Sequence, residues 1–229
     1  MQHNSGFAKF LRVVGIILMS LTAAITLMGG IGTVCAALFT EKYAAESASM
    51  AKLVGWGWLY TLFMLVTTAI GVLMVRAVVL LIKAAPTSYR DTLISLVAGV
   101  VVGFIHIFTS RALRGASMPV DMVTYSAVLT LIVFLIFRIP GIWSGVDFTR
   151  GKDQNKMAGG AAAIVLGITC LAIPSMVGAS HTWELGINWA NAFDTMLIPL
   201  GLALVLSGLG WGFYTSLPET RRAVAQTSK

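Results

Sequence analysis

Charge is scarce in this sequence. Only 11% of its 229 residues are Asp, Glu, Lys or Arg, whereas a soluble domain carries about 25% charged residues. So little charge cannot cover a water-soluble globule, which excludes that class of protein. The 57% of hydrophobic residues and the mean hydropathy of +0.86 indicate a chain that lies in a membrane.

Catalytic motifs are also missing. The sequence contains no P-loop pattern, no Gly-x-Gly-x-x-Gly and no His-Glu-x-x-His. Ser144-Gly145 lacks the Gly two places before Ser that an intramembrane serine protease would need. The two cysteines, Cys35 and Cys170, both lie in apolar runs, where Cys usually acts as a small hydrophobic residue. Nothing in the sequence indicates an enzyme.

Acidic residues are absent from the middle of every long apolar stretch. Ionisable groups deep in a membrane cost free energy, and those that are present often mark ion and proton pathways. Their absence argues against a proton- or sodium-coupled carrier that works through a carboxylate. Facilitated transport of a small neutral solute stays open as an alternative.

Six apolar stretches approach or exceed the length of about 20 residues that crosses a bilayer as a helix. We predict spans at about 10–39, 53–82, 93–110, 120–139, 157–177 and 191–214. The Gly29–Gly32 run is expected to bend the long first span, because glycine pairs are common kink sites. The connections are too short to fold alone, so we expect one all-helical transmembrane domain over 1–229.

Basic residues predict the orientation, because Lys and Arg collect in cytoplasmic loops. With the N-terminus inside, the cytoplasmic side holds 12 of the 16 basic residues: Lys9, Arg12, Arg76, Lys83, Arg90, Arg138, Arg150, Lys152, Lys156, Arg221, Arg222 and Lys229. The other side holds Lys42, Lys52, Arg111 and Arg114. We therefore expect both termini in the cytoplasm of a bacterial-type inner membrane. The net charge of +7 is interpreted as this topology signal and not as a sign of nucleic-acid binding.

Several spans carry small residues on one side when each residue is turned by about 100°. Those expected to mediate helix packing are Ser95, Gly99, Gly103, Gly160, Ala163, Gly167, Gly201, Gly208 and Gly212. Small residues let helix backbones approach closely in lipid. We favour tight packing for these faces, and the alternative is that they line a substrate path.

His106 is the exception to the absence of ionisable groups inside the spans. It lies about 20 Å along the third span from its inner end, on the small-residue face. The favoured interpretation is a neutral His hydrogen-bonded to a neighbouring helix. The alternative is a ligand for haem, a pigment or a metal, so the cofactor is left unknown.

Polar residues gather on the predicted outer side. Arg111, Arg114, Asp121 and Tyr125 would form a polar rim around the helix ends. His181 and Glu184 from the last outer loop could join His106 and Asp194 as metal ligands if the bundle brings them together. A solvated rim with weak surface ion pairs is the favoured interpretation.

The leading functional prediction is a non-catalytic accessory or scaffold subunit of a larger membrane assembly. Its expected partners are membrane lipid and other membrane subunits, with no nucleic acid. The charged inner stretch with Asp147, Arg150, Lys152, Asp153 and Lys156 could touch anionic lipid or a partner subunit. A small-solute permease or channel and a cofactor-holding subunit that uses His106 are the alternatives.

Overall fold

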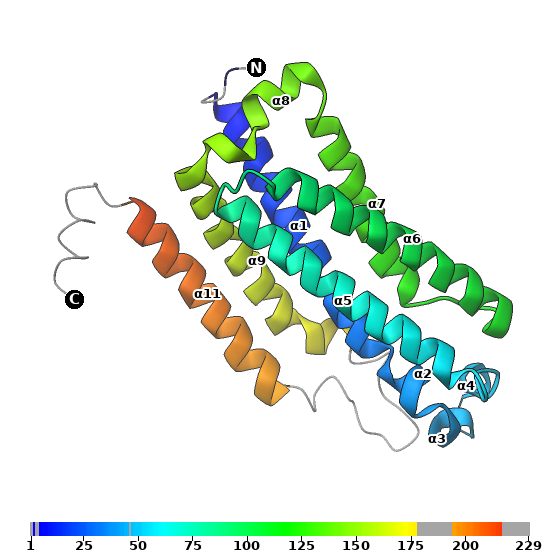
Figure 1. The fold of residues 1–229 in the computed structure, drawn as a ribbon. Helices are drawn as coiled ribbons and strands as arrows, with labels where there is room; N and C mark the ends of the chain where they lie inside the picture. Colours follow the sequence, from blue (N-terminus) through cyan, green and yellow to red (C-terminus); the bar gives the residue numbers. More distant parts are fainter. Residues whose placement is uncertain (1, 3–4, 46, 178–193, 217–229) are drawn as a thin grey trace.

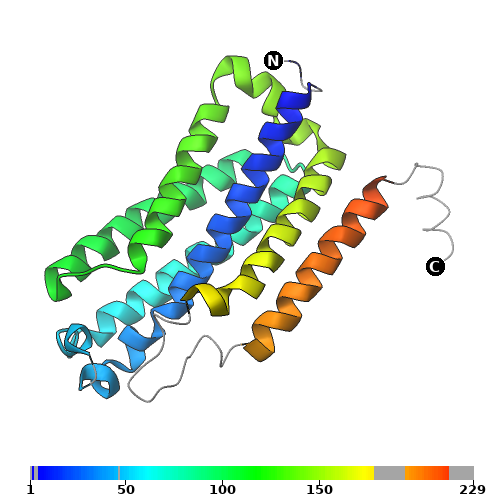
Figure 2. The same ribbon diagram turned by 180° about the vertical axis from the view of Figure 1, so that it is seen from behind.

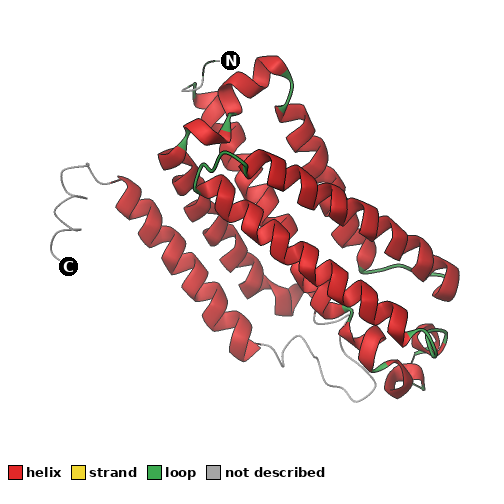
Figure 3. Cartoon of the chain, in the orientation of Figure 1, coloured by secondary structure: helices red, strands yellow, loops and turns green. Residues whose placement is uncertain are grey.

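The computed structural model describes residues 2, 5–45, 47–177 and 194–216. Over these residues every regular element is a helix (Figure 3). Six helical segments are long and apolar enough to cross a membrane. The prediction of an all-helical chain with six candidate membrane spans is therefore confirmed.

The elements follow one another as a series of long helices with short ones between them. Their bounds are α1 Gly6–Gly32, α2 Val34–Leu38, α3 Thr40–Ala44, α4 Ala48–Ala51, α5 Gly57–Ile82, α6 Ser88–Arg114, α7 Val120–Phe137, α8 Pro140–Val146, a 3₁₀ turn Phe148–Arg150, α9 Lys152–Val177 and α11 Asp194–Ser216.

The helix bounds differ from the predicted spans mainly at the ends. The third span is longer than predicted, because polar residues such as Ser88 and Arg114 continue the helix beyond its apolar part. The second span begins at Gly57 instead of residue 53. The short helices α3, α4 and α8 were not expected, because hydropathy reports only elements long enough to cross a membrane.

The first span is interrupted directly after its glycine run. Helix α1 ends at Gly32 and α2 begins at Val34. Thr33, between them, donates from its hydroxyl to the carbonyl of Gly29 at 2.8 Å. Glycine at this place lowers the cost of leaving regular helix geometry, so the break lies where the glycine run predicts a bend.

Local signals explain several other ends. The hydroxyl of Ser5 accepts a hydrogen bond from the backbone N–H of Ala8 at 3.2 Å and caps α1. Helix α6 stops at Gly115, whose φ of +77° places it in the left-handed region that glycine adopts easily. Pro140 occupies the first position of α8, where the missing N–H costs nothing.

Helix α1 lies at the centre of the molecule. It packs against α5, α7 and α9, and α6 closes a four-helix bundle by contacting both α5 and α7. Figure 2 shows α1 between α7 on one side and α9 on the other. Helix α11 packs on α9 and lies at the edge of the molecule (Figure 1).

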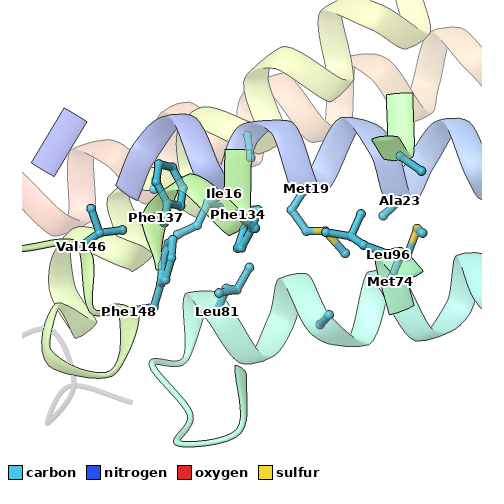
Figure 4. Close-up of a cluster of buried hydrophobic side chains, with 14 of the residues drawn as sticks. Ile16, Met19, Ala23, Met74, Leu81, Leu96, Phe134, Phe137, Val146 and Phe148 are labelled. Carbon is cyan, nitrogen blue, oxygen red and sulfur yellow. The ribbon is translucent and has the colours of Figure 1, made fainter. Parts of the chain in front are cut away.

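The interior is filled by side chains from α1, α5, α6, α7, α8, the 3₁₀ turn and α9. Figure 4 shows Ile16, Met19 and Ala23 of α1 facing this core together with residues from the other elements. Phe134 of α7 stacks on Phe148 with ring centroids 5.7 Å apart. Large apolar residues also cover the outer surface, as expected for a bundle whose outside faces lipid.

Candidate functional site

The antiparallel order of the long helices gives the molecule two ends. The N-terminal end carries the start of α1, the end of α5, the start of α6, the end of α7, α8 and the start of α9 (Figure 1). The opposite end carries α2, α3 and α4, the start of α5, the end of α6 and the start of α7.

His106 lies inside the bundle, where only 3% of its surface is exposed. Its ring stacks on Phe63 of α5 with centroids 4.1 Å apart and planes within 7°. Tyr60, one turn earlier on α5, meets the same ring edge-on at 5.5 Å. The Nε2 atom is buried without a hydrogen-bond partner among the described residues. The ring of His106 therefore contacts two aromatic rings of α5, and the proposed hydrogen bond to a neighbouring helix stays a prediction.

A small cavity adjoins His106, with a volume of about 20 Å³. Thr26 of α1 also lines it, and its hydroxyl oxygen is likewise buried without a hydrogen-bond partner among the described residues. A cavity of this size holds about one water molecule. His106 and Thr26 both line the cavity and offer polar groups to such a water. A haem or pigment needs several hundred Å³, which is more than this cavity holds.

The predicted metal set is not brought together in the described part of the chain. His106 is on α6, which packs on α5 and α7, whereas Asp194 opens α11, which packs on α9. His181 and Glu184 lie outside the described residues. Within the described ranges no group of three or more His, Cys, Asp or Glu could hold a metal ion. The four-residue site stays a prediction.

Three of the four residues of the predicted polar rim, Arg111, Arg114 and Asp121, lie around the turn between α6 and α7 at the opposite end. Arg111 at the end of α6 forms an ion pair with Asp121 at the start of α7, with 3.0 Å between nitrogen and oxygen. Ser117, which sequence reasoning missed, accepts from Arg111 at 2.9 Å and donates to Asp121 at 2.6 Å. Arg114 donates to the carbonyl of Met118 at 2.7 Å. These contacts fix the turn between α6 and α7.

Tyr125 lies apart from these contacts. It packs edge-on against Phe104 with centroids 6.5 Å apart, and its side chain is exposed. It therefore contributes to the surface of the α6–α7 pair and not to the ion-pair network.

The small residues of α6 lie at contacts with α5 and α7. A Cβ added at Gly99 would come within 2.7 Å of the Met74 side chain of α5. One added at Gly103 would overlap the hydroxyl of Thr124 in α7. Ser95 is buried and donates its hydroxyl to the carbonyl of Thr92 in its own helix at 3.0 Å. Gly103 needs a small side chain because the body of the Thr124 side chain lies against it, whereas the neighbour of Gly99 is the flexible end of Met74.

The small residues of α9 and α11 face one another. A Cβ at Gly167 would lie 2.6 Å from the carbonyl oxygen of Gly201, and one at Gly160 would lie 3.2 Å from that of Gly208. Ala163, between the two glycines of α9, is half-buried. A Cβ at Gly212 would meet nothing within 4 Å. Backbone contact over about two turns explains how α11 holds to α9 in lipid, where apolar side chains supply little net attraction.

The other side of α11 is exposed within the part of the chain that the structure describes. Ala203, Ser207 and Gly210 lie about 180–240° around the helix from Gly201 and are exposed. A Cβ added at Gly210 would meet nothing within 4 Å. We call these three residues the outer face of α11. It repeats the small-residue spacing that joins α11 to α9, and no described residue packs against Gly210.

A buried polar cluster at the N-terminal end was not predicted from the sequence. Asn155 of α9 is fully buried and donates to the carbonyls of Leu81 at 2.8 Å and Phe148 at 2.6 Å. Arg12 of α1 is also fully buried, and its guanidinium lies against Gly151. The cluster ties α1, the end of α5 and the start of α9 together. From the sequence alone Arg12 is expected to be exposed at the membrane surface. Its burial depends on contacts with segments far along the chain, which local sequence does not reveal.

Comparisons with protein-family models, with curated proteins and with solved structures find no match for this chain.

Proposed function

We propose that the chain is a non-catalytic subunit of a larger membrane assembly and that α11 contacts its partner. The observation that carries this proposal is the position of α11. Of the described elements, only α9 makes extensive contact with α11, and the outer face of Ala203, Ser207 and Gly210 is exposed among the described residues.

The physical reason lies in what holds membrane helices together. Lipid tails are as apolar as leucine, so helices associate through close backbone approach, which small residues allow. Within the chain, the α9–α11 contact uses Gly160, Gly167, Gly201 and Gly208 in this way. The outer face offers the same kind of surface to a transmembrane helix of another subunit or of a second copy.

The interior supports a packing role as well. The four-helix bundle is filled by the core cluster, and the cavity beside His106 has room for about one water. Threonine hydroxyls join helices directly, as in the 2.7 Å contact between the side-chain oxygens of Thr22 on α1 and Thr130 on α7. Such contacts give a rigid body on which a partner can assemble.

The proposal includes the location of the protein. We infer a bacterial-type cytoplasmic membrane with both termini in the cytoplasm, because the connections and adjoining helix segments at the N-terminal end carry most of the basic residues.

The test compares two bulky substitutions on α11. Gly210→Leu places a large side chain on the outer face, where an added Cβ meets nothing within 4 Å, and Leu202→Phe enlarges an exposed side chain on a neighbouring side of the helix. We expect the wild type, purified from its native membrane in mild detergent, to migrate as a complex. Gly210→Leu should weaken the association by about tenfold or more, whereas Leu202→Phe should leave it unchanged.

Two results would contradict the proposal. One is a wild-type protein that runs as a lone monomer and brings no other membrane chain with it. The other is equal association in both variants, which would show that the outer face of α11 does not contact a partner. The thermal stability of each variant serves as the control for folding.

A further inference from the structure

A hollow opens at the N-terminal end, beside α8. It has a volume of about 500 Å³ and opens to the surroundings. The residues that line it share polar, basic or aromatic character apart from one proline, and they are Arg138, Pro140, Trp143, Ser144, Asp147 and Arg150. It is therefore a charged surface feature and differs in kind from the apolar faces of the spans.

Arg138 is held in this hollow by aromatic rings. Its guanidinium carbon lies 4.8 Å from the centroid of Trp143 and 5.7 Å from that of Tyr89. The two rings meet edge-on at 4.7 Å. Tyr89 is fixed in turn, because its hydroxyl donates to the carbonyl of Phe134 at 2.7 Å. Cation–π contacts orient the guanidinium and leave its N–H groups able to bind an anion.

The charge of the hollow is not cancelled. Arg138 forms no ion pair within the part of the chain that the structure describes. Asp147 is engaged by Arg150 at 3.1 Å and also accepts from the backbone and hydroxyl of Thr149. Two arginines against one carboxylate leave a net charge of about +1 at neutral pH.

The position of the hollow indicates the source of the anion. It lies where α7 ends, and the apolar side chains of Ile136 and Ile139 are exposed beside it. Tryptophan is typical of the level at which lipid headgroups lie. Basic pockets between helix ends at this depth suit lipid phosphates, with the acyl chains along the neighbouring apolar surface.

We propose that this hollow binds the phosphate of an anionic phospholipid headgroup through Arg138 and Arg150. Guanidinium groups recognise phosphate oxygens with paired N–H donors, which gives the site geometry as well as charge. The site would hold a lipid at the junction of α6, α7 and α8 on whichever side of the membrane this end faces. It does not depend on the proposed partner of α11.

The experiment measures lipid binding to the full chain in detergent by native mass spectrometry. The probes are phosphatidylglycerol, phosphatidylcholine and inorganic phosphate. We expect the wild type to retain phosphatidylglycerol in preference to phosphatidylcholine. Arg138→Gln and Arg150→Gln should each weaken phosphatidylglycerol binding by about fivefold, the effect of one basic residue at a membrane surface. Excess inorganic phosphate should not displace the lipid.

Arg90→Gln is the matched control. It removes an arginine at the same end, on α6, that is exposed, is paired with Asp91 and does not line the hollow. Equal loss of lipid in Arg90→Gln and in the two site variants would overturn the proposal, because binding would follow total charge. Displacement of the lipid by inorganic phosphate would also overturn it, as would equal binding of the two lipids. If Arg138→Gln fails to fold, Arg150→Gln decides the question.

Discussion

Asn155 shows how much one buried polar residue can organise. Its amide donates to carbonyls at the end of α5 and in the 3₁₀ turn before α9, and so joins segments more than 70 positions apart along the chain. Water is excluded at this place, so each lost hydrogen bond leaves a carbonyl with one partner fewer and no solvent to replace it. A polar side chain here stabilises a particular arrangement of helix ends.

Asn155→Ala is expected to lower the free energy of unfolding by about 1–3 kcal/mol, because it removes both donors and leaves a small void. Asp153→Ala, on the same turn but 72% exposed, is the control and should change it by less than about 0.5 kcal/mol. Thermal unfolding in detergent measures both. Equal effects would show that the buried amide contributes nothing particular.

His106 illustrates what residue-level reasoning from sequence could and could not reach. Its place within a span and on the small-residue face is read directly from helical spacing. Its stacking on Phe63 cannot be predicted from helical spacing, because that contact joins α5 and α6 across more than 40 positions. The role of Ser117 could not be predicted for the same reason, because it depends on where the turn places Arg111 and Asp121.

At the scale of helices, the glycines set the distances between axes. Gly30 of α1 approaches the backbone of Thr68, and Gly71 of α5 approaches the backbone of Leu27, so each helix brings a glycine against the backbone of the other. The α9–α11 pair repeats this arrangement with Gly167 and Gly201. Dispersion between close backbones replaces the hydrophobic attraction that soluble helices use.

Gly167→Ala tests this dependence. The added methyl group would lie 2.6 Å from the carbonyl oxygen of Gly201, and backbone must move to accommodate it. We expect a loss of stability of about 1–3 kcal/mol, as for other overpacked sites. Gly210→Ala on the exposed side of α11 is the matched control and should be neutral. Thermal unfolding, or cross-linking between α9 and α11, gives the readout, and an equal response of both variants would contradict the packing argument.

Element boundaries were predicted less well than element number. The apolar run sets where a helix can lie in lipid, but α6 extends at both ends through polar residues that remain helical. Helix α8 is only seven residues long. It contributes to the hollow beside α8 because Trp143 contacts Arg138 and Tyr89. Hydropathy does not predict such contacts.

At the scale of the whole molecule, the distribution of charge between the two ends is the main directional feature. The described basic residues of the N-terminal end are Lys9, Arg12, Arg76, Lys83, Arg90, Arg138, Arg150, Lys152 and Lys156. Those of the opposite end are Lys42, Lys52, Arg111 and Arg114. The asymmetry supports an inside location for the N-terminal end.

Single-cysteine labelling tests this orientation. In a background with Cys35→Ser and Cys170→Ser, the change Ala116→Cys places an exposed thiol at the opposite end, and Thr149→Cys places one at the N-terminal end. A membrane-impermeant maleimide applied to intact cells should label only the Ala116→Cys protein. After the membrane is permeabilised, both should react. The reverse pattern in intact cells would invert the orientation.

The sequence by itself determined that the protein belongs in a membrane and that six helices can cross it, because hydropathy and helix length are sums over neighbouring residues. It also marked which helix sides carry small residues. Only the tertiary structure decided which of those sides are used, because lipid-facing and buried side chains are equally apolar and hydrophobic periodicity cannot separate them. The burial of Arg12 and Asn155, the exposed side of α11 and the basic hollow beside α8 all follow from contacts between distant positions.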